Sequence, residues 1–397
     1  MPPLPSTPLT LGLVSLHTSP ASDPGIGDAG GMNVVVRNQA LALGALGHTV
    51  ELLTRRSSPD QPAVVELSEG VVLRFLDAGP AQPVPKGVHE EFIDDFAHAM
   101  EAFGPYDVIH SHHWFSGMAA LPITRERGIP HLQSFHSIAA DSSTPLSEGE
   151  RPESPGRLAG EALLARESDR VVAISAAEAE TVVHRLGGRA TNVRVVSPGV
   201  DSELFHPGAR SAKPYAVVAG RLDPLKGFDL AIEAIALLPS SERPELVVAG
   251  EESVDYADYP AELGALAVAH GIRDGVRFVG PQSRSQLAAL LRGAAVVLIP
   301  SHSETYGLVA LEAAASGTPV VAAAAGGLRE AVVDGVTGLV LASLEASVWA
   351  AAIRRILNDP DLAESFSTTA RVRATGLSWA HSAEALVTVY RNALGLQ

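Results

Sequence analysis

Short apolar segments alternate with helical segments along the chain. In the first half, the apolar segments predict strands at residues 11–16, 50–54, 71–75, 108–110, 131–135, 171–174 and 193–196. In the second half, they predict strands at residues 215–219, 246–249, 276–279, 295–299, 319–322 and 338–341. Helices are predicted between them, for example at 34–46, 228–238 and 284–292. This alternation is typical of α/β proteins whose parallel sheets carry helices on both faces.

Each half has enough strands for a doubly wound sheet of its own, so the sequence predicts two domains. A length of 397 residues agrees with that number. The polar segment 205–214 is the best linker, because it lies between two strands and contains Pro and Gly. We therefore divide the chain into residues 1–208 and 209–376. The segment 142–155, rich in Ser, Pro, Glu and Gly, is predicted to be a surface loop or a mobile lid.

Composition narrows the class of protein further. Hydrophobic residues make up 46% of the chain, which is enough to bury two cores. The formal net charge of −16, without a basic stripe, argues against a nucleic-acid partner. The absence of cysteine excludes disulfides and a cysteine nucleophile. The first ten residues contain no basic residue, unlike a secretory signal, and no apolar run approaches the roughly 18 residues of a membrane span. We expect a soluble, cytoplasmic protein.

A glycine-rich loop at residues 24–33 follows the first predicted strand and leads into the first helix. Glycines let backbone N–H groups approach an anion, and the helix N-terminus favours negative charge, so the loop is predicted to bind phosphate. Its spacing matches a dinucleotide-binding loop only loosely, through Gly25, Gly27, Gly30 and Gly31. The second predicted strand ends in Thr54-Arg55-Arg56, where a dinucleotide site would have an acidic residue. A nicotinamide oxidoreductase is therefore disfavoured.

Charged residues follow two predicted strands of the second half. Arg221 and Lys226 lie five residues apart after the strand at 215–219, and both can reach one diphosphate. Glu304 and Glu312 lie eight residues apart after the strand at 295–299, and they can face the same pocket. Between them, the backbone N–H groups of residues 307–309 begin a helix and can bind an anion. The alternative is that these are solvated surface charges and a helix cap.

Histidines after two strands of the first half raise the question of a metal site. They are His110, His112, His113 and His136. No carboxylate lies nearby in the sequence to complete a ligand set, so we expect no metal. Asp359-Pro360-Asp361 has the spacing of a metal-binding D-x-D motif but is predicted to be a helix cap and turn.

Taken together, these motifs resemble the retaining GT-B glycosyltransferases of family GT4. The resemblance extends from Leu11 to Trp379, and its combination of motifs is specific. Within the family it is closest to the D-inositol-3-phosphate glycosyltransferases of mycothiol synthesis. The residues that carry this closer similarity lie in the segments 15–20, 27–33, 110–117 and 196–201. The resemblance implies two Rossmann-like domains that face a central cleft. It also implies that a closing helix at 377–397 returns to the first domain.

The family implies roles for the residues around the donor. Arg221 and Lys226 would bind the diphosphate, Glu312 the ribose, and Glu304 the donor sugar. The backbone of Gly307, Leu308 and Val309 would lie near the phosphates. The first domain would contribute Gly31, Asn33 and His136, with His136 near the reacting carbon.

The family also implies a site for the acceptor's phosphate. Lys86, Ser137 and Arg157 match its positions, with Ser137 in place of a family Thr, and Asn33 and His113 would also contact the acceptor. The sequence departs from the family at His113, where the family has Tyr, and at Ser142-Ser143, where it has Lys-Asn. These departures affect recognition of the acceptor rather than the transfer chemistry. The alternative for Arg157 is an ion pair with Glu161 on its own helix.

We therefore expect a retaining hexosyltransferase with a UDP-sugar donor, carrying GlcNAc or glucose. The acceptor would be a small polyol or sugar, such as an inositol phosphate. The leaving diphosphate would accept the acceptor's proton, so no cofactor or metal is expected. The alternatives are a nucleotide-sugar 2-epimerase of the same fold and a non-catalytic nucleotide-sugar binder. The sequence leaves a homodimer open.

Overall fold

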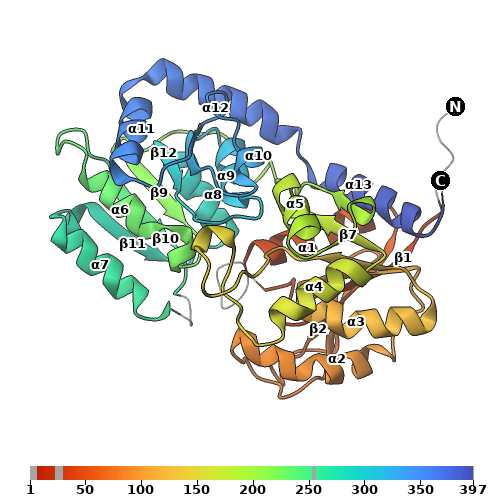
Figure 1. Ribbon diagram of the computed structural model, residues 1–397. Helices are drawn as coiled ribbons and strands as arrows, with labels where there is room; N and C mark the ends of the chain where they lie inside the picture. Colours follow the sequence, from red (N-terminus) through yellow and green to blue (C-terminus); the bar gives the residue numbers. More distant parts are fainter. Residues whose placement is uncertain (1–6, 23–29, 253–255, 397) are drawn as a thin grey trace, which may run out of the picture.

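The computed structural model describes residues 7–22, 30–252 and 256–396, which form two parallel sheets side by side (Figure 1). The first sheet has the strand order β3-β4-β2-β1-β5-β6-β7-β8. Its strands are β1 (Thr10–Val14), β2 (Thr49–Arg55), β3 (Val64–Ser68), β4 (Val71–Leu76), β5 (Val108–His112), β6 (His131–Ser134), β7 (Arg170–Ala173) and β8 (Val193–Val195). The second sheet has the order β11-β10-β9-β12-β13-β14. Its strands are β9 (Tyr215–Ala219), β10 (Glu245–Ala249), β11 (Val276–Gly280), β12 (Val296–Ile299), β13 (Val320–Ala323) and β14 (Leu339–Leu341).

Helices cover both faces of the first sheet. Apolar side chains of α1 (Gly31–Ala45) and α13 (Trp379–Ala393) pack on one face. The other face is covered by α2 (Ile93–Met100), α3 (Trp114–Arg127), α4 (Arg157–Glu167) and α5 (Ala176–His184). Figure 1 shows α13 on one side of the first sheet and α2 and α3 on the other. The sheet therefore has a separate hydrophobic core on each side.

One continuous core fills the second half of the molecule. It lies between the second sheet and the helices α6 (Phe228–Ala236), α7 (Tyr259–Ala269), α8 (Arg284–Gly293), α9 (Leu308–Ala315), α10 (Leu328–Ala331), α11 (Ala346–Asn358) and α12 (Pro360–Thr375). Asp359 caps α12, because its Oδ1 accepts a hydrogen bond from the Leu362 amide at 3.0 Å. This confirms the predicted role of the Asp359–Asp361 motif.

The predicted fold class is confirmed, and each predicted strand has a counterpart within a few residues. The prediction missed β3, which pairs antiparallel with β4 at the edge of an otherwise parallel sheet. Every residue of β3 is at least partly exposed, so the strand lacks the continuous apolar run of the buried strands. Two of the three predicted helices begin at the predicted residue and the third begins three residues early, at Gly31.

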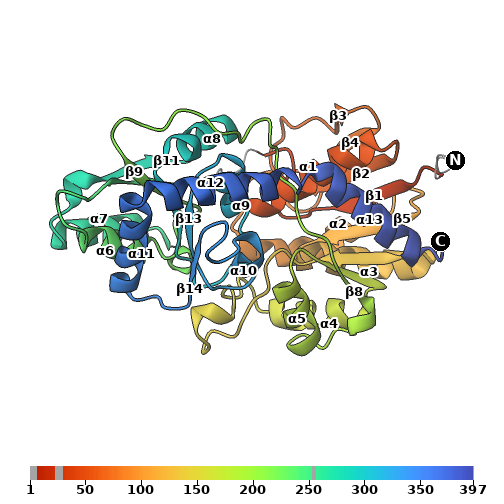
Figure 2. The same ribbon diagram turned by 90° about the horizontal axis from the view of Figure 1, so that it is seen from above.

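The last helix completes the first half of the molecule. Figure 2 shows α12 over the second half and α13 over the first, where α13 packs against α1. Gln39 of α1 donates a hydrogen bond to Ser382 Oγ at 3.0 Å, and the buried Tyr390 hydroxyl bonds His110 Nδ1 at 2.9 Å. The helix α13 therefore packs on the first sheet, next to α1. The division at residues 208 and 209 falls in the connection between β8 and β9 and stays a prediction.

Removing the Tyr390 hydroxyl should destabilise the protein without changing the surface exposed on unfolding. Tyr390→Phe leaves one nitrogen of the buried His110 ring without its partner, which should cost about 1–2 kcal/mol in the free energy of unfolding. Urea unfolding should show a lower midpoint with an unchanged m-value. Thr388→Ala, on the exposed side of the same helix, is the matched control and should change stability by less than about 0.5 kcal/mol. Equal stability of Tyr390→Phe and the wild type would contradict this role of α13.

Candidate active site

A cavity of about 340 Å³ lies between the two halves, where loops from the carboxyl ends of both sheets meet. Parallel sheets place ligands at this edge, because the loops that follow the strands converge there. Most of the predicted site residues line it. They are Gly31, Lys86, His113, His136, Ser137, Arg221, Lys226, Glu304, Gly307, Leu308, Val309 and Glu312. Asn33 and Arg157 are not among the lining residues.

The loop after β9 carries the two predicted diphosphate ligands. Asp223 caps the 3₁₀ turn η4 (Pro224–Lys226) by accepting the Leu225 amide at 2.6 Å, and it holds Arg221 Nη2 at 3.3 Å. Lys226 Nζ donates to Glu304 Oε1 at 2.7 Å. Burial lowers the pKa of Lys226, but the carboxylates of Glu304 and Asp223 outweigh it and raise that pKa overall. Lys226 is therefore a cation in the cavity wall. It is held there by Glu304, the residue predicted to contact the donor sugar.

The loop after β12 is held by a pair of glycines that follow β13. The Gly327 amide donates to the Glu304 carbonyl at 2.9 Å. A Cβ at Gly326 would lie 2.1 Å from the Glu304 carbonyl oxygen, and one at Gly327 would lie 2.2 Å from the Thr305 oxygen. Gly307 caps α9 with a φ of 101°, a conformation that favours glycine. Glycines therefore fix the backbone that presents Glu304 and the N-terminus of α9 to the cavity.

Arg284 is a cavity residue that the sequence did not reveal. It begins α8, lines the cavity, and pairs with Glu312 Oε1 at 2.6 Å. Burial raises the pKa of Glu312 even beside this cation. The predicted ribose ligand is thus oriented by an arginine from another element. The available signal was the position of Arg284 just after a strand, the same position that identified Arg221.

The glycine-rich loop approaches the second half from the first. A Cβ on Gly31 would lie 3.4 Å from Leu308 Cδ1, so little space separates the start of α1 from the start of α9. Asn33 faces inward instead. Its side chain accepts the Gly30 amide at 3.1 Å and donates to Thr18 Oγ1 at 2.9 Å and the Ser19 carbonyl at 2.7 Å. Gly25 and Gly27 lie outside the described residues.

Histidines line the first-domain wall in strained conformations. His113 and His136 have φ angles of 69° and 61°, which are uncommon for residues with a side chain. His136 Nε2 lies 2.8 Å from His112 Nδ1, and the His136 carbonyl accepts the Thr305 hydroxyl from the second half at 2.6 Å. Burial lowers the pKa of His136 to about 3. At neutral pH it is therefore an uncharged ring whose position is fixed from both halves.

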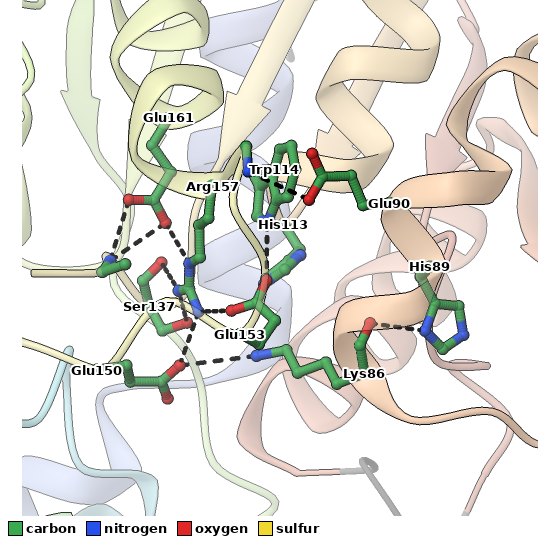
Figure 3. Close-up of polar contacts among 12 residues, drawn as sticks. Lys86, His89, Glu90, His113, Trp114, Ser137, Glu150, Glu153, Arg157 and Glu161 are labelled. Carbon is green, nitrogen blue, oxygen red and sulfur yellow. Dashed lines mark hydrogen bonds and ion pairs between the residues drawn. The ribbon is translucent and has the colours of Figure 1, made fainter. Parts of the chain in front are cut away.

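The predicted acceptor residues Lys86, Ser137 and Arg157 come together in one ionic cluster (Figure 3). Arg157 is fully buried, and its Nη2 donates to Ser137 Oγ at 2.9 Å. Its Nε donates to Glu161 Oε1 at 2.8 Å. The ion pair with Glu161 that the sequence left as an alternative is therefore present, but in the interior rather than on an exposed helix face.

Two further carboxylates complete the cluster, and the sequence did not reveal them. Glu153 Oε2 pairs with Arg157 Nη1, and Glu153 Oε1 accepts the indole N–H of Trp114 at 2.8 Å. Glu150 Oε2 lies 3.3 Å from Arg157 Nη1 and 3.7 Å from Lys86 Nζ. Both come from the segment predicted as a surface loop or lid. Its first part, including Ser142 and Ser143, is exposed, whereas Glu150 and Glu153 turn inward.

In the described part of the chain, no three His, Asp or Glu side chains are grouped to hold a metal ion. Among the same residues, no helix is long and apolar enough to cross a membrane.

Comparison with known proteins places this geometry in a class. Residues 30–199 match the model of the glycosyl transferase 4-like domain, and residues 201–373 match that of the glycosyl transferases group 1. The structure is similar to sucrose-phosphate synthase from Thermosynechococcus elongatus, with a TM-score of 0.89, 30% identity, and coverage of 98% of this chain and 99% of that one. It is also similar to Anabaena HepE in complex with UDP and glucose, with a TM-score of 0.75, 18% identity, and coverage of 97% and 100%. The fold and its cleft are those of a GT-B glycosyltransferase.

Curated relatives narrow the class to a family. The D-inositol 3-phosphate glycosyltransferase of Kribbella flavida is 41% identical over 415 residues, covering 99% of this chain and 98% of the relative. That of Saccharomonospora viridis is 39% identical over 409 residues, covering 98% and 95%. The chain belongs to the GT4-type glycosyltransferases and is an enzyme of the hexosyltransferase class, close to the inositol phosphate glycosyltransferases. These relatives favour sugar transfer over the epimerase and the non-catalytic binder.

Buried histidines should make the protein lose stability in mild acid. Burial lowers the pKa of His89 to about 4 and that of His110, His131 and His136 to about 3, whereas in the unfolded chain they titrate near 6.5. Their stabilising contribution is therefore complete above pH 6.5 and is lost as the pH falls towards 4. Burial raises the pKa of Glu178 to about 7, so its protonation in mild acid stabilises the fold. This gain offsets roughly the loss from one histidine. The net loss from pH 7.5 to 5.5 should be several kcal/mol, at about 1.4 kcal/mol per group and pH unit.

Urea unfolding at the two pH values measures this loss directly. His131→Asn removes one of these histidines at a place outside the cavity, so it should flatten the pH dependence. Equal unfolding free energies at pH 7.5 and 5.5 would show that the buried rings are not kept neutral by the fold.

Proposed function

We propose that the enzyme transfers a sugar, GlcNAc or glucose, from a UDP-sugar to a hydroxyl of a small phosphorylated polyol such as an inositol phosphate. The observation that carries this proposal is the pairing of two cationic walls across one cavity. Arg221 and Lys226 lie on the wall from the second half, and Lys86 lies on the wall from the first. His136 lines the same cavity, between the loops of both halves.

Several features support a nucleotide diphosphate on the second-half wall. Arg221 offers a planar fork and Lys226 a point charge, which together suit a diphosphate. The first N–H groups of α9 have no acceptor within the helix and can complete its binding. Glu312 is buried beside the cavity and can accept ribose hydroxyls. Uridine as the base is favoured by the similarity of the fold to HepE, which was solved with UDP and glucose.

The first-half wall supports an anionic acceptor. Lys86 and Ser137 line the cavity, and Arg157 lies directly behind Ser137. A cation and a hydroxyl donor, backed by a second cation, suit a phosphate group. The names of the curated relatives, D-inositol 3-phosphate glycosyltransferases, support an inositol phosphate.

Transfer can proceed on one face of the sugar without a protein nucleophile. The bond between the anomeric carbon and the diphosphate oxygen breaks, and negative charge develops on that oxygen. Arg221, Lys226 and the N-terminus of α9 stabilise this charge. The acceptor hydroxyl forms the new bond on the same face and gives its proton to the departing diphosphate, so configuration is retained. When the diphosphate takes Lys226, Glu304 is released to accept hydrogen bonds from the sugar. No metal or other cofactor is needed in this scheme; location in the cytoplasm and a homodimer stay predictions.

A donor screen tests the proposal. UDP-, GDP- and ADP-sugars are supplied with and without an inositol phosphate, and released nucleotide and new glycoside are measured. Release from a UDP-sugar that depends on the acceptor supports the proposal. Preference for another base, or release without glycoside formation, would contradict it.

Removal of either predicted diphosphate ligand should slow transfer strongly. Arg221→Ala and Lys226→Ala should each lower kcat/KM, because each removes a charge-assisted contact to the leaving group. The expected loss of transition-state stabilisation is about 2–4 kcal/mol. Arg277→Ala, an exposed cation of the same half that pairs with Glu245, is the matched control and should leave kcat/KM unchanged. Wild-type rates in both site variants would rule out this diphosphate site.

Chelation should not abolish transfer. Two cations and a helix N-terminus neutralise the leaving group in the proposed scheme, so the initial rate should be the same with and without EDTA. Loss of activity with EDTA and its recovery on addition of Mg²⁺ or Mn²⁺ would reveal a metal requirement.

A further inference from the structure

One side chain of the ionic cluster differs from the others in its exposure. Glu161 is 1% exposed and receives two bonds from the Ala139 amide, at 3.2 and 3.0 Å, besides that from Arg157. Glu153 is 8% exposed and bound to Trp114. Glu150 is 24% exposed and, of these three carboxylates, is the one that lines the cavity. Glu161 and Glu153 are structural partners of Arg157, whereas Glu150 stands between the cluster and any ligand.

The carboxylate of Glu150 is surrounded by cations from both halves. Oε2 lies 3.3 Å from Arg157 Nη1 and 3.7 Å from Lys86 Nζ, and Oε1 lies 3.9 Å from Arg221 Nη2 across the cavity. Burial alone would raise the pKa of Glu150, but Lys86, Arg157 and Arg221 outweigh it and lower that pKa, so the group stays ionised. An anion therefore already occupies the position between the cations that the proposed function assigns to the acceptor's phosphate.

The cluster has no excess of positive charge as it stands. Arg157, Lys86 and Arg221 supply three positive charges, against the carboxylates of Glu150, Glu153 and Glu161 and that of Asp223, the closer partner of Arg221. A phosphate added to this set would meet at least as much repulsion as attraction. A phosphate that displaces Glu150 would instead take over its cations. Displacement of the Glu150 carboxylate is thus the simplest way to make room for a second anion.

Glu150 can move without the loop that carries it. Its backbone is fixed, because its carbonyl accepts the Ala140 amide at 2.8 Å, and a Cβ on the preceding Gly149 would lie 2.4 Å from the Ile138 carbonyl oxygen. Its side-chain contacts are long, from 3.3 to 3.9 Å, and rest on charge more than on short directed hydrogen bonds. Rotation of the side chain alone would vacate the position.

We propose that Glu150 determines acceptor specificity, because its carboxylate occupies the acceptor's anion position and competes with a phosphorylated acceptor for Lys86 and Arg157. The proposal rests on the acceptor site described under the proposed function. It assigns to this chain an internal anion that weakens the preference for phosphorylated over unphosphorylated acceptors. Glu150→Gln keeps the size of the side chain and removes the competing charge.

Kinetics with a matched pair of acceptors test this role. In Glu150→Gln, the KM for an inositol phosphate should fall by about tenfold, because one repelling charge next to the phosphate is gone, while the KM for inositol stays the same. Glu150→Asp keeps the charge and should stay close to the wild type. Glu148→Gln, an exposed neutralisation two residues away, should change neither KM. An increased KM for either acceptor in Glu150→Gln would overturn the proposal, since Glu150 would then assist acceptor binding. Unchanged values for both would also overturn it.

A binding measurement separates this proposal from the proposed function. Inorganic phosphate should raise the melting temperature of Glu150→Gln more than that of the wild type, and the double variant Lys86→Ala/Glu150→Gln should lose the gain. The double variant is the control for phosphate bound at the donor wall, because a gain that came from that wall would not depend on Lys86. If no sugar is transferred to either acceptor but this pattern holds, the anion site stands and the proposed reaction falls. An equal response of wild type and Glu150→Gln to phosphate would overturn the role of Glu150, whatever the enzyme transfers.

Discussion

The charge of Arg157 has to be balanced where water cannot reach it, and the first-half wall of the cleft is built around that requirement. A lone buried guanidinium would cost several kcal/mol in desolvation. Its donor groups are instead directed at Glu150, Glu153, Glu161 and Ser137, which come from three different segments of the fold. The chain after β6 therefore has to turn inward, although its composition is that of a surface loop. Lys86 is drawn to the same place by Glu150, so a cation reaches the cavity from a fourth segment.

The second-half wall follows the same principle with fewer groups. Lys226 is held by Glu304 and Arg221 by Asp223, so both cations already have an anionic partner within the protein. Such pairs keep long side chains in place before a ligand arrives, and they lower the cost of ordering them afterwards. They also mean that an entering anion exchanges one partner for another rather than binding a bare charge. In the proposed reaction, both substrates would then be recognised by how well they replace a carboxylate of the protein.

Much of this arrangement could be predicted from the sequence, because buried strands and the residues that follow them leave local patterns. Strands such as β9 and β12 are continuous apolar runs, and Arg221 and Glu304 were found because they directly follow them. β3 was missed because an edge strand that is exposed along its length needs no such run. Arg284 was missed although it follows a strand, because its partner Glu312 lies on another element. Glu150 and Glu153 were missed although Arg157 is near them in the sequence, because the segment that carries them has the composition of a surface loop. Asn33 ends the glycine-rich loop, but its side chain bonds Gly30, Thr18 and Ser19 instead of lining the cavity, and this depends on how the segment before the loop folds back.

The return of α13 to the first sheet has a consequence for how the protein is made. One face of that sheet is covered partly by Leu386, Val389 and Tyr390, close to the end of the chain. On the ribosome, the strands of the first half emerge long before these residues. At about 5–20 residues per second, the remaining half of the chain takes roughly 10–40 seconds to appear. During that time α1 covers this face of the first sheet without α13, so the packing of the first half is complete only after residues 379–393 have emerged.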